Sequence, residues 1–235
     1  MGEVTSTQAI AFGLAERGAP DRTVVVADHQ TAGRGRRGRI WHDAPGQNLL
    51  VSILARPQLA WRCLPTLSFA AAAAVGEALE TVAGLRARLK WPNDVVVNGR
   101  KIAGILLESR PAETPVVVVG VGVNVAQASF PSGIAARATS IALETDRAID
   151  REALLQALLD AFDRWRGRLE REGFAALREH WLALSATIGQ HVTVDEVSGR
   201  AVDLDLDGAL VLEDGAARRR VIAGEISAAA PTPLD

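Results

Sequence analysis

The chain has 235 residues, of which 48% are hydrophobic and 23% charged, an ordinary balance for a globular protein with a sizeable core. Its 26 basic and 28 acidic residues leave a net charge of −2, so no overall field recruits nucleic acid or an anionic membrane, and an anion site must come from local clustering. A single cysteine excludes an internal disulfide, and the first residues lack the pattern of a signal peptide, so a cytoplasmic protein is expected.

The predicted elements begin with a capped helix over residues 7–17, followed by strands at 23–27 and 48–55. The polar, glycine-rich connection between the two strands, residues 29–47, is unusually long. A connection of this length in a compact domain is more often functional than accidental. Residues 64–82 are rich in alanine and apolar on most faces, which predicts a buried helix against a sheet.

Four strands are predicted next, at residues 86–91, 95–97, 102–108 and 115–125. Asn98-Gly99 marks a tight hairpin between the second and third of them. The sheet is therefore expected to be mixed but mostly antiparallel. None of these strands is a membrane span, because even the apolar run 116–123 is far shorter than the roughly 20 residues that a span needs.

Residues 151–185 have helical spacing interrupted at Gly173, which predicts two helices. The pattern then changes to short strands, at 192–197, 201–206, 209–212 and 220–226, separated by Gly or Asp-Gly turns. This predicts a small all-β barrel at the end of the chain. The larger domain before it is expected to be an α/β domain of the α+β type, in which helices pack on one sheet. The expected domains are residues 1–186 and 187–235.

Lysine is nearly absent from the chain: 24 of the 26 basic residues are arginine, and the two lysines are Lys90 and Lys101. A planar guanidinium cannot replace a compact ammonium at a site that needs a point charge. Both lysines are therefore candidate site residues, although a codon bias would leave the same composition.

Residues 33–39 read Gly-Arg-Gly-Arg-Arg-Gly-Arg, four guanidiniums and three glycines. Glycines let the backbone approach a ligand closely, and arginine forks and backbone N–H groups suit phosphate and carboxylate oxygens. The segment, called the basic loop below, is predicted to wrap an anion and to become ordered when it does so. A solvated basic loop and nonspecific contact with nucleic acid are the alternatives.

The motif Lys90-Trp-Pro-Asn-Asp94 places a base, an aromatic ring and a carboxylate around a proline. If the hairpin closes at Val97 and Arg100, Asp94 and Lys101 lie on neighbouring strands and are near enough to interact. Glycines within the next two strands, at positions 104, 120 and 122, remove side chains where a ligand or a backbone approaches, or else relieve crowding in a bent sheet.

These motifs carry a resemblance. The basic loop, Lys-Trp-Pro-Asn-Asp, Arg-Lys-Ile-Ala-Gly-Ile-Leu at 100–106, Gly-Val-Gly-Val-Asn at 120–124 and Gly-Glu-Ile-Ser at 224–227 occur in the order seen in biotin protein ligases. The chain resembles that family over nearly its whole length. The resemblance implies a class II aminoacyl-tRNA synthetase/biotin ligase-like sheet followed by an SH3-like β-barrel.

The same resemblance implies an ATP-dependent ligase. Biotin and ATP are its substrates, with Mg²⁺ expected, and the products of the first step are biotinyl-5′-AMP and pyrophosphate. Biotin then passes to a lysine of a biotin carboxyl carrier protein or domain. The nearest rival enzyme is a lipoate or octanoate transferase; a biotin-binding module without catalysis and a basic-loop nucleic-acid binder are rivals of other classes.

Carried over position by position, the resemblance implies three groups of site residues. The catalytic group is Lys101 and Arg36 by this resemblance, and chemical reasoning adds two residues: Asp94, to orient or deprotonate the acceptor lysine, and Lys90, to pair with Asp94 as its support. The biotin-binding group is Ser6, Thr7, Gln8, Gln30, Arg34, Gly35, Arg36, Lys101, Gly104, Leu106 and Gly122. The ATP-binding group is Arg36, Arg39, Trp41 and Asn124. Metal ligands are left open.

Two departures from the family pattern concern the N-terminus. The family usually reads Asp-Ser-Thr-Asn where this chain has Thr5-Ser-Thr-Gln8, which puts the contacts of the last position in question. Only five residues precede Ser6, which leaves no room for the DNA-binding helices of the bifunctional repressor members. A monofunctional ligase without DNA or membrane binding is expected, and a homodimer through an uncovered sheet face is left open.

Overall fold

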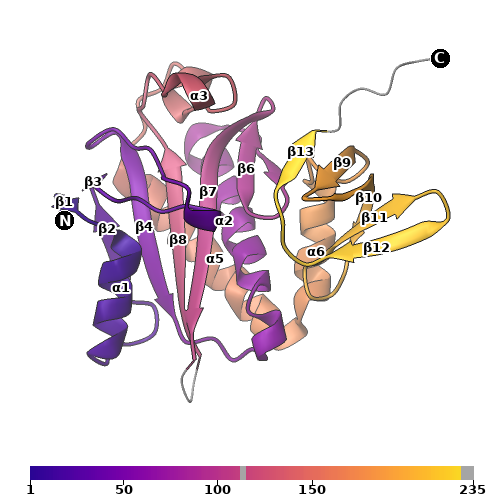
Figure 1. Ribbon diagram of the computed structural model, residues 1–235. Coiled ribbons are helices and arrows are strands. Elements are labelled where there is room, and N and C mark those ends of the chain that lie inside the picture. Colours follow the sequence, from indigo (N-terminus) through magenta and orange to yellow (C-terminus); the bar gives the residue numbers. More distant parts are fainter. Residues whose placement is uncertain (112–114, 229–235) are drawn as a thin grey trace.

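A six-stranded sheet forms the centre of the computed structural model, which describes residues 1–111 and 115–228 (Figure 1). Its strands, in spatial order, are β2 (Val24–Ala27), β4 (Asn48–Ala55), β8 (Val116–Asn124), β7 (Arg100–Arg110), β6 (Asp94–Val97) and β5 (Arg88–Lys90). Every neighbouring pair in this sheet is antiparallel, as predicted. A parallel pair, β1 (Glu3–Val4) with β3 (His29–Gln30), lies beside it and makes the architecture mixed.

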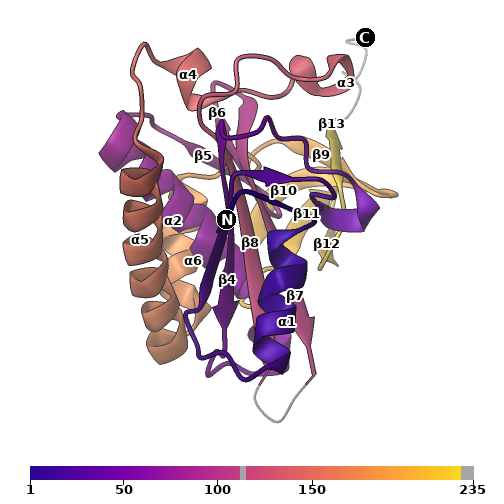
Figure 2. The same cartoon turned by 90° about the vertical axis from the view of Figure 1, so that its left-hand side faces the viewer.

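Helices cover both faces of this sheet, as Figure 2 shows. One face packs against α2 (Thr66–Ala83) and α5 (Arg151–Glu172), with α6 (Phe174–Ala183) packed against these two helices, and the other face carries α1 (Thr7–Glu16). The break between α5 and α6 falls at Gly173, as predicted, where a φ of 74° suits glycine. Asp150 caps α5 by accepting a hydrogen bond from the Glu152 N–H.

The alanine-rich helix α2 is the core helix of the fold. Alanines 70–74 are at most 2% exposed, because their small side chains allow the helix to lie close to the sheet and to α5. By length and composition alone, the segment Trp61–Ala83 is apolar enough to cross a membrane, but 72% of its apolar stretch is buried inside the protein. The apolar segment that resembles a span is thus this helix, not the strand run 116–123.

The hairpin between β6 and β7 closes at Val97 and Arg100, as the sequence predicted. Asn98 and Gly99 have φ values of 50° and 75°, the left-handed conformations that a two-residue turn of this type requires. β7 is longer than the predicted strand at 102–108, and β5 is shorter than the predicted strand at 86–91.

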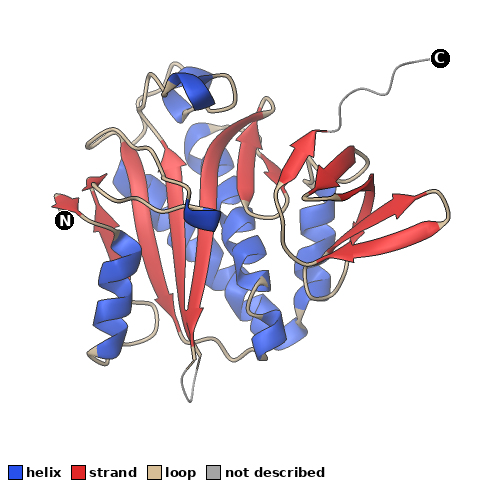
Figure 3. Cartoon of the chain, in the orientation of Figure 1, coloured by secondary structure: helices blue, strands red, loops and turns tan. Residues whose placement is uncertain are grey.

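A second sheet, antiparallel throughout, follows α6 (Figure 3). Its order is β12 (Ala217–Val221), β11 (Leu210–Asp214), β10 (Val197–Leu204), β9 (His191–Val194) and β13 (Ile226–Ala228). The predicted strand 192–197 is wrong, because Asp195 adopts a φ of 53° and turns the chain between β9 and β10. The predicted strand 220–226 is wrong as well: it combines the end of β12 with the start of β13, so five strands stand where four were expected. Residues 229–235 of the expected barrel domain lie outside the described residues.

Trp91 joins the two sheets. Its indole is 1% exposed, and its Nε1–H donates to the Gly208 carbonyl oxygen at 3.1 Å, while its backbone N–H donates to Thr187 Oγ1 at 3.0 Å. The small sheet is therefore attached directly to the Lys-Trp-Pro-Asn-Asp motif.

Short elements that the sequence did not predict complete the fold. They are the 3₁₀ turns η1 (Arg36–Gly38) and η2 (Trp61–Cys63) and the helices α3 (Ser132–Ala135) and α4 (Ile141–Glu144). Each is too short for a periodic pattern to be visible in the sequence.

Candidate active site

A cavity of about 680 Å³ lies on the sheet face that carries α1, where the basic loop crosses in front of β8 and β7 (Figure 1). Every residue that the sequence singled out as catalytic, biotin-binding or ATP-binding lines it. They come from the start of α1 (Ser6, Thr7, Gln8), from β3 (Gln30), from the basic loop and the residue two places after it (Arg34, Gly35, Arg36, Arg39, Trp41), from β5 and β6 (Lys90, Asp94), from β7 (Lys101, Gly104, Leu106) and from β8 (Gly122, Asn124).

Lys101 and Asp94 form an ion pair in this cavity, with Nζ and Oδ1 2.5 Å apart. The side chains lie on adjacent strands, and a bulge between Val95 and Val96 sets Asp94 opposite Gly104. A Cβ at Gly104 would be 3.0 Å from the Nζ of Lys101. This glycine therefore leaves the space in which the ammonium reaches the carboxylate.

Lys90 lies opposite Asp94 in the strand register but does not pair with it, since the carboxylate contacts Lys101. Within the described part of the chain Lys90 has no ion pair. The suggested support of Asp94 by Lys90 is therefore not formed as an ion pair in this structure.

The indole of Trp41 lies against the strand glycines. A Cβ at Gly122 would be 2.6 Å from its ring, and one at Gly104 would be 3.1 Å away. The ring also lies 5.7 Å from the Nζ of Lys101, within range of a cation–π interaction. The two glycines thus serve close approach by an aromatic side chain.

Two buried polar atoms at the cavity have no partner among the described residues: Ser6 Oγ and Trp41 Nε1. Buried polar groups are nearly always hydrogen-bonded, so unpartnered ones beside a cavity point to a ligand. Next to Ser6, Thr7 donates from its N–H and its Oγ1 to Gln30 Oε1, at 2.8 and 3.1 Å. One end of the cavity is therefore a preorganised polar cluster.

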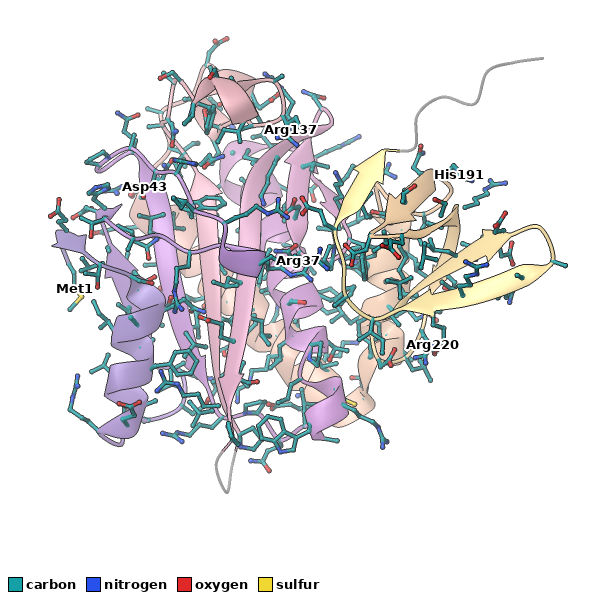
Figure 4. All side chains as sticks on the ribbon, in the orientation of Figure 1. Met1, Arg37, Asp43, Arg137, His191 and Arg220 are labelled. Atoms are coloured by element: carbon teal, nitrogen blue, oxygen red, sulfur yellow. The ribbon has the colours of Figure 1, made fainter. Side chains whose placement is uncertain are left out.

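Each arginine of the basic loop has a partner that the sequence did not reveal. Arg34 pairs with Glu108 at 2.9 Å, Arg36 donates to Asn93 Oδ1 at 3.3 Å, Arg37 pairs with Asp195 at 2.6 Å, and Arg39 pairs with Glu225. Asp195 and Glu225 lie in the connections beside strands of the small sheet, and Arg37 is seen at this junction in Figure 4. The ordering of the loop on ligand binding stays a prediction.

Arg36 is the most enclosed of the four cations. Burial, and next repulsion from Arg37, lowers the pKa of the Arg36 guanidinium, while Asp94 acts in the opposite direction. An arginine so perturbed still carries its charge near neutral pH. The cavity thus holds a half-buried permanent cation close to the Lys101–Asp94 pair.

The segment around α3 supplies lining residues that sequence reasoning missed. Phe130, Ile134, Arg137 and Ala138 line the cavity, and Arg137 is labelled in Figure 4. The backbone of Lys101 contacts this segment, because its N–H donates to the Arg137 carbonyl oxygen at 2.7 Å. No motif marks this segment in the sequence.

Gln8 and Asn124 line the cavity with their amides already engaged. Gln8 Nε2 donates to Glu108 Oε2 at 2.9 Å, and Asn124 Nδ2 donates to the Thr139 carbonyl at 2.8 Å. The described residues contain no group of three or more His, Cys, Asp or Glu side chains that could hold a metal ion.

Comparisons with known proteins find similar sequences and a similar fold. Residues 1–124 match the model of the biotin/lipoate A/B protein ligase family, and residues 187–228 match that of the biotin protein ligase C-terminal domain. The biotin–[acetyl-CoA-carboxylase] ligase of Paracoccus denitrificans is 40% identical over 96% of this chain and 98% of its own length. The bifunctional ligase/repressor BirA of Bacillus subtilis is 35% identical over 95% of this chain and 71% of its own length. Among solved structures, biotin protein ligase from Aquifex aeolicus in complex with biotin and ATP has a TM-score of 0.85 and 29% identity, covering 97% of this chain and 96% of that one.

Proposed function

The chain belongs to the biotin/lipoate A/B protein ligase family and is an ATP-dependent biotin protein ligase, and from this premise we propose how its residues divide the work. The enzyme activates biotin as biotinyl-5′-AMP with release of pyrophosphate, and it then transfers biotin to an acceptor protein. The observation that carries the assignment of roles is the cavity, in which two cations and unpartnered polar atoms converge.

Activation brings two anions together, the biotin carboxylate and the α-phosphate of ATP. At ~4 Å and an effective dielectric constant near 20, each pair of unit charges repels by roughly 4 kcal/mol. We assign the neutralisation to Lys101 and Arg36, which line the same cavity and come from a strand and a loop respectively. The same cations stabilise the charge that develops at phosphorus.

Biotin is assigned to the polar cluster and the glycine-lined slot. Ser6 Oγ, which has no hydrogen-bond partner among the described residues, can bond the ureido ring, with Thr7 and Gln30 beside it. Gly104, Leu106 and Gly122 are assigned to the apolar part, which would lie beside the ring of Trp41 that packs on the two glycines, and Arg34 and Gly35 would close the basic loop over it.

ATP is assigned to the neighbouring part of the cavity. Trp41 offers a ring face to adenine, Asn124 a remaining amide oxygen, and Arg36 and Arg39 cations for the phosphates. Asp94 and Glu225 are carboxylates that line the cavity, and each already pairs with a cation. This donor set fits Mg²⁺ that arrives on the phosphates, since Mg²⁺ commonly keeps several waters and takes few protein ligands.

Transfer requires a neutral amine. The acceptor lysine attacks the carbonyl carbon of the mixed anhydride, AMP leaves, and the amine loses a proton. We assign orientation or acceptance of that proton to Asp94, with Lys90 as a nearby cation.

The acceptor is the carboxyl carrier of a biotin-dependent carboxylase, as the names of relatives indicate. We further propose two domains, residues 1–186 and an SH3-like barrel at 187–235, supported by the start of the second family match at residue 187. The five-stranded antiparallel sheet suits such a barrel. A cytoplasmic location, the absence of DNA or membrane binding and a homodimer stay predictions.

The test is to mix the purified protein with biotin, ATP and Mg²⁺ and to measure pyrophosphate, then to add a carrier domain and measure biotinylation. Lipoate in place of biotin is the control, because the family model covers both classes of ligase. Release with biotin and none with lipoate is expected. Release with lipoate alone would assign the chain to the rival class.

A further inference from the structure

Three elements meet at the carboxylate of Glu108, on β7. Arg34 of the basic loop donates from Nη1 to Oε1 at 3.3 Å and from Nη2 to Oε2 at 2.9 Å. Gln8 of α1 donates from Nε2 to the same Oε2 at 2.9 Å. Residues separated by 74 and 100 positions in the chain thus share one carboxylate.

Gln8 is built into this position. It is 4% exposed, and its Oε1 accepts a hydrogen bond from Ser52 Oγ at 3.0 Å. A Cβ at Gly120 would be 3.1 Å from its amide, so this strand glycine leaves the room that the glutamine fills. With its oxygen and nitrogen both engaged, Gln8 holds the carboxylate of Glu108 in one orientation.

Glu108 lies behind the residues that line the cavity. Arg34 and Gln8 line the cavity, whereas Glu108 is not among the lining residues. The fork of Arg34 matches the two oxygens of a carboxylate, a geometry that a lysine cannot reproduce. The carboxylate therefore fixes where the arginine, and the loop that carries it, stands relative to the sheet.

We propose that Glu108 and Gln8 are positioning residues that hold Arg34, and with it the start of the basic loop, closed over the biotin end of the cavity. The proposal rests on the proposed function for the identity of the ligand. It also accounts for the glutamine at position 8: an asparagine, one methylene shorter, would not reach the carboxylate from the same backbone. The contacts of Glu108 with Arg34 and Gln8, called the latch below, are separate from the contacts of Arg37 and Arg39 with residues beside the small sheet.

The experiment compares Glu108→Gln, Gln8→Asn and Arg34→Lys with the unmodified protein. Two assays are used. Steady-state pyrophosphate release gives the KM for biotin and the kcat, and limited proteolysis gives the rate at which trypsin cuts the basic loop without ligands. Glu108→Gln removes the charge but keeps the size. It is expected to raise the biotin KM and the rate of trypsin cleavage about threefold to tenfold and to change kcat less than twofold, since a charge-assisted bond is lost and the reacting cations stay. Gln8→Asn is expected to raise the biotin KM and the rate of trypsin cleavage by a smaller factor.

The matched control is Glu172→Gln. Glu172 pairs with Arg168 at 2.9 Å on the exposed surface of α5, far along the chain from the basic loop, so this variant removes an equivalent ion pair without touching the latch. Its KM, kcat and cleavage rate are expected to equal those of the unmodified protein.

The proposal is overturned if Glu108→Gln leaves KM and cleavage unchanged, or if it lowers kcat with KM unchanged. Arg34→Lys, at a half-exposed side chain, applies the same test if Glu108→Gln does not fold. If the unmodified protein releases no pyrophosphate, the proposed function is refuted. The trypsin assay needs no ligand, so the effect of Glu108→Gln on the loop can still be measured in that case.

Discussion

At Gly122 the absence of a side chain has a direct structural use. The ring of Trp41 occupies the space where a Cβ would stand, 2.6 Å from its atoms. Such a distance is too short for real contacts, so any larger residue must displace either the ring or the strand. Gly122 therefore controls where the ring of Trp41, which we propose contacts adenine, lies.

Gly122→Ala is expected to raise the KM for ATP about tenfold, because overpacking of this kind costs ~1–3 kcal/mol. Steady-state pyrophosphate release at saturating biotin measures it. Gly133→Ala is the control, since a Cβ there meets nothing within 4 Å. An unchanged KM in Gly122→Ala would mean that the ring is free to move without consequence.

The two lysines differ in what they contact. Lys101 pairs with Asp94 and lies beside Trp41, whereas Lys90 has no ion pair in the described residues. Lys101→Ala is expected to slow adenylate formation ~100-fold or more, the effect of removing one preorganised charge from a transition state. Lys90→Arg is expected to slow it less than threefold. Single-turnover formation of biotinyl-5′-AMP measures both, and equal losses would refute this ranking.

At the scale of elements, the basic loop connects the two sheets. The turn between β9 and β10 places Asp195 against Arg37, with hydrogen bonds of 2.6 and 2.7 Å. The hydrogen bond from Arg37 is the main reason that the pKa of Asp195 lies below 3.8, its ordinary value, and burial acts in the opposite direction. Because the folded-state pKa is lowered, the contribution of this pair is present above about pH 3.8 and is lost as the pH falls through the folded-state pKa.

Asp195→Asn is therefore expected to lower the protection of residues 33–41 from amide hydrogen exchange at pH 7 by about twofold to fivefold, the range of an exposed ion pair. The difference from the unmodified protein is expected to disappear at a pH below the folded-state pKa of Asp195, after correction for the intrinsic exchange rate. Glu213→Gln, which breaks an exposed pair with Arg218 in the same sheet, is the control. Equal protection in Asp195→Asn and the unmodified protein at pH 7 would show that this pair does not hold the loop.

At the scale of the whole molecule, Trp91 attaches the small sheet to the catalytic motif. Its Nε1–H reaches the Gly208 carbonyl across 117 positions of sequence, and the indole is buried. The side chain that neighbours Lys90 is thus a structural contact between the two sheets, which explains why the motif contains a large aromatic residue.

Trp91→Phe is expected to reduce the free energy of unfolding by ~1–3 kcal/mol, because it leaves the Gly208 carbonyl buried and unpaired. Urea denaturation followed by circular dichroism measures it. Trp61→Phe is the control, at a side chain in η2 that is 49% exposed. Equal stability of both variants would indicate that water replaces the lost donor.

Local features of the sequence predicted most of the elements, and the family resemblance supplied most of the candidate site residues, all of which line one cavity. The hairpin at Asn98-Gly99 follows from the conformation that a two-residue turn demands, so the meeting of Asp94 with Lys101 could be predicted from spacing alone. The break at Gly173 follows from helix chemistry in the same way. Patterns failed where turns and strands are short, as at Asp195 and at the boundary between β12 and β13.

The sequence by itself determined which charges are scarce, where glycines open the backbone and which motifs the chain contains, because these depend on composition and on neighbours along the chain. Only the tertiary structure decided the partners of those charges. Glu108 lies 74 positions from Arg34 and Asp195 lies 158 from Arg37, and contacts across such separations leave no periodic trace. They form when sheets and loops pack, because packing places acidic side chains that look ordinary in the sequence next to the arginines of the basic loop.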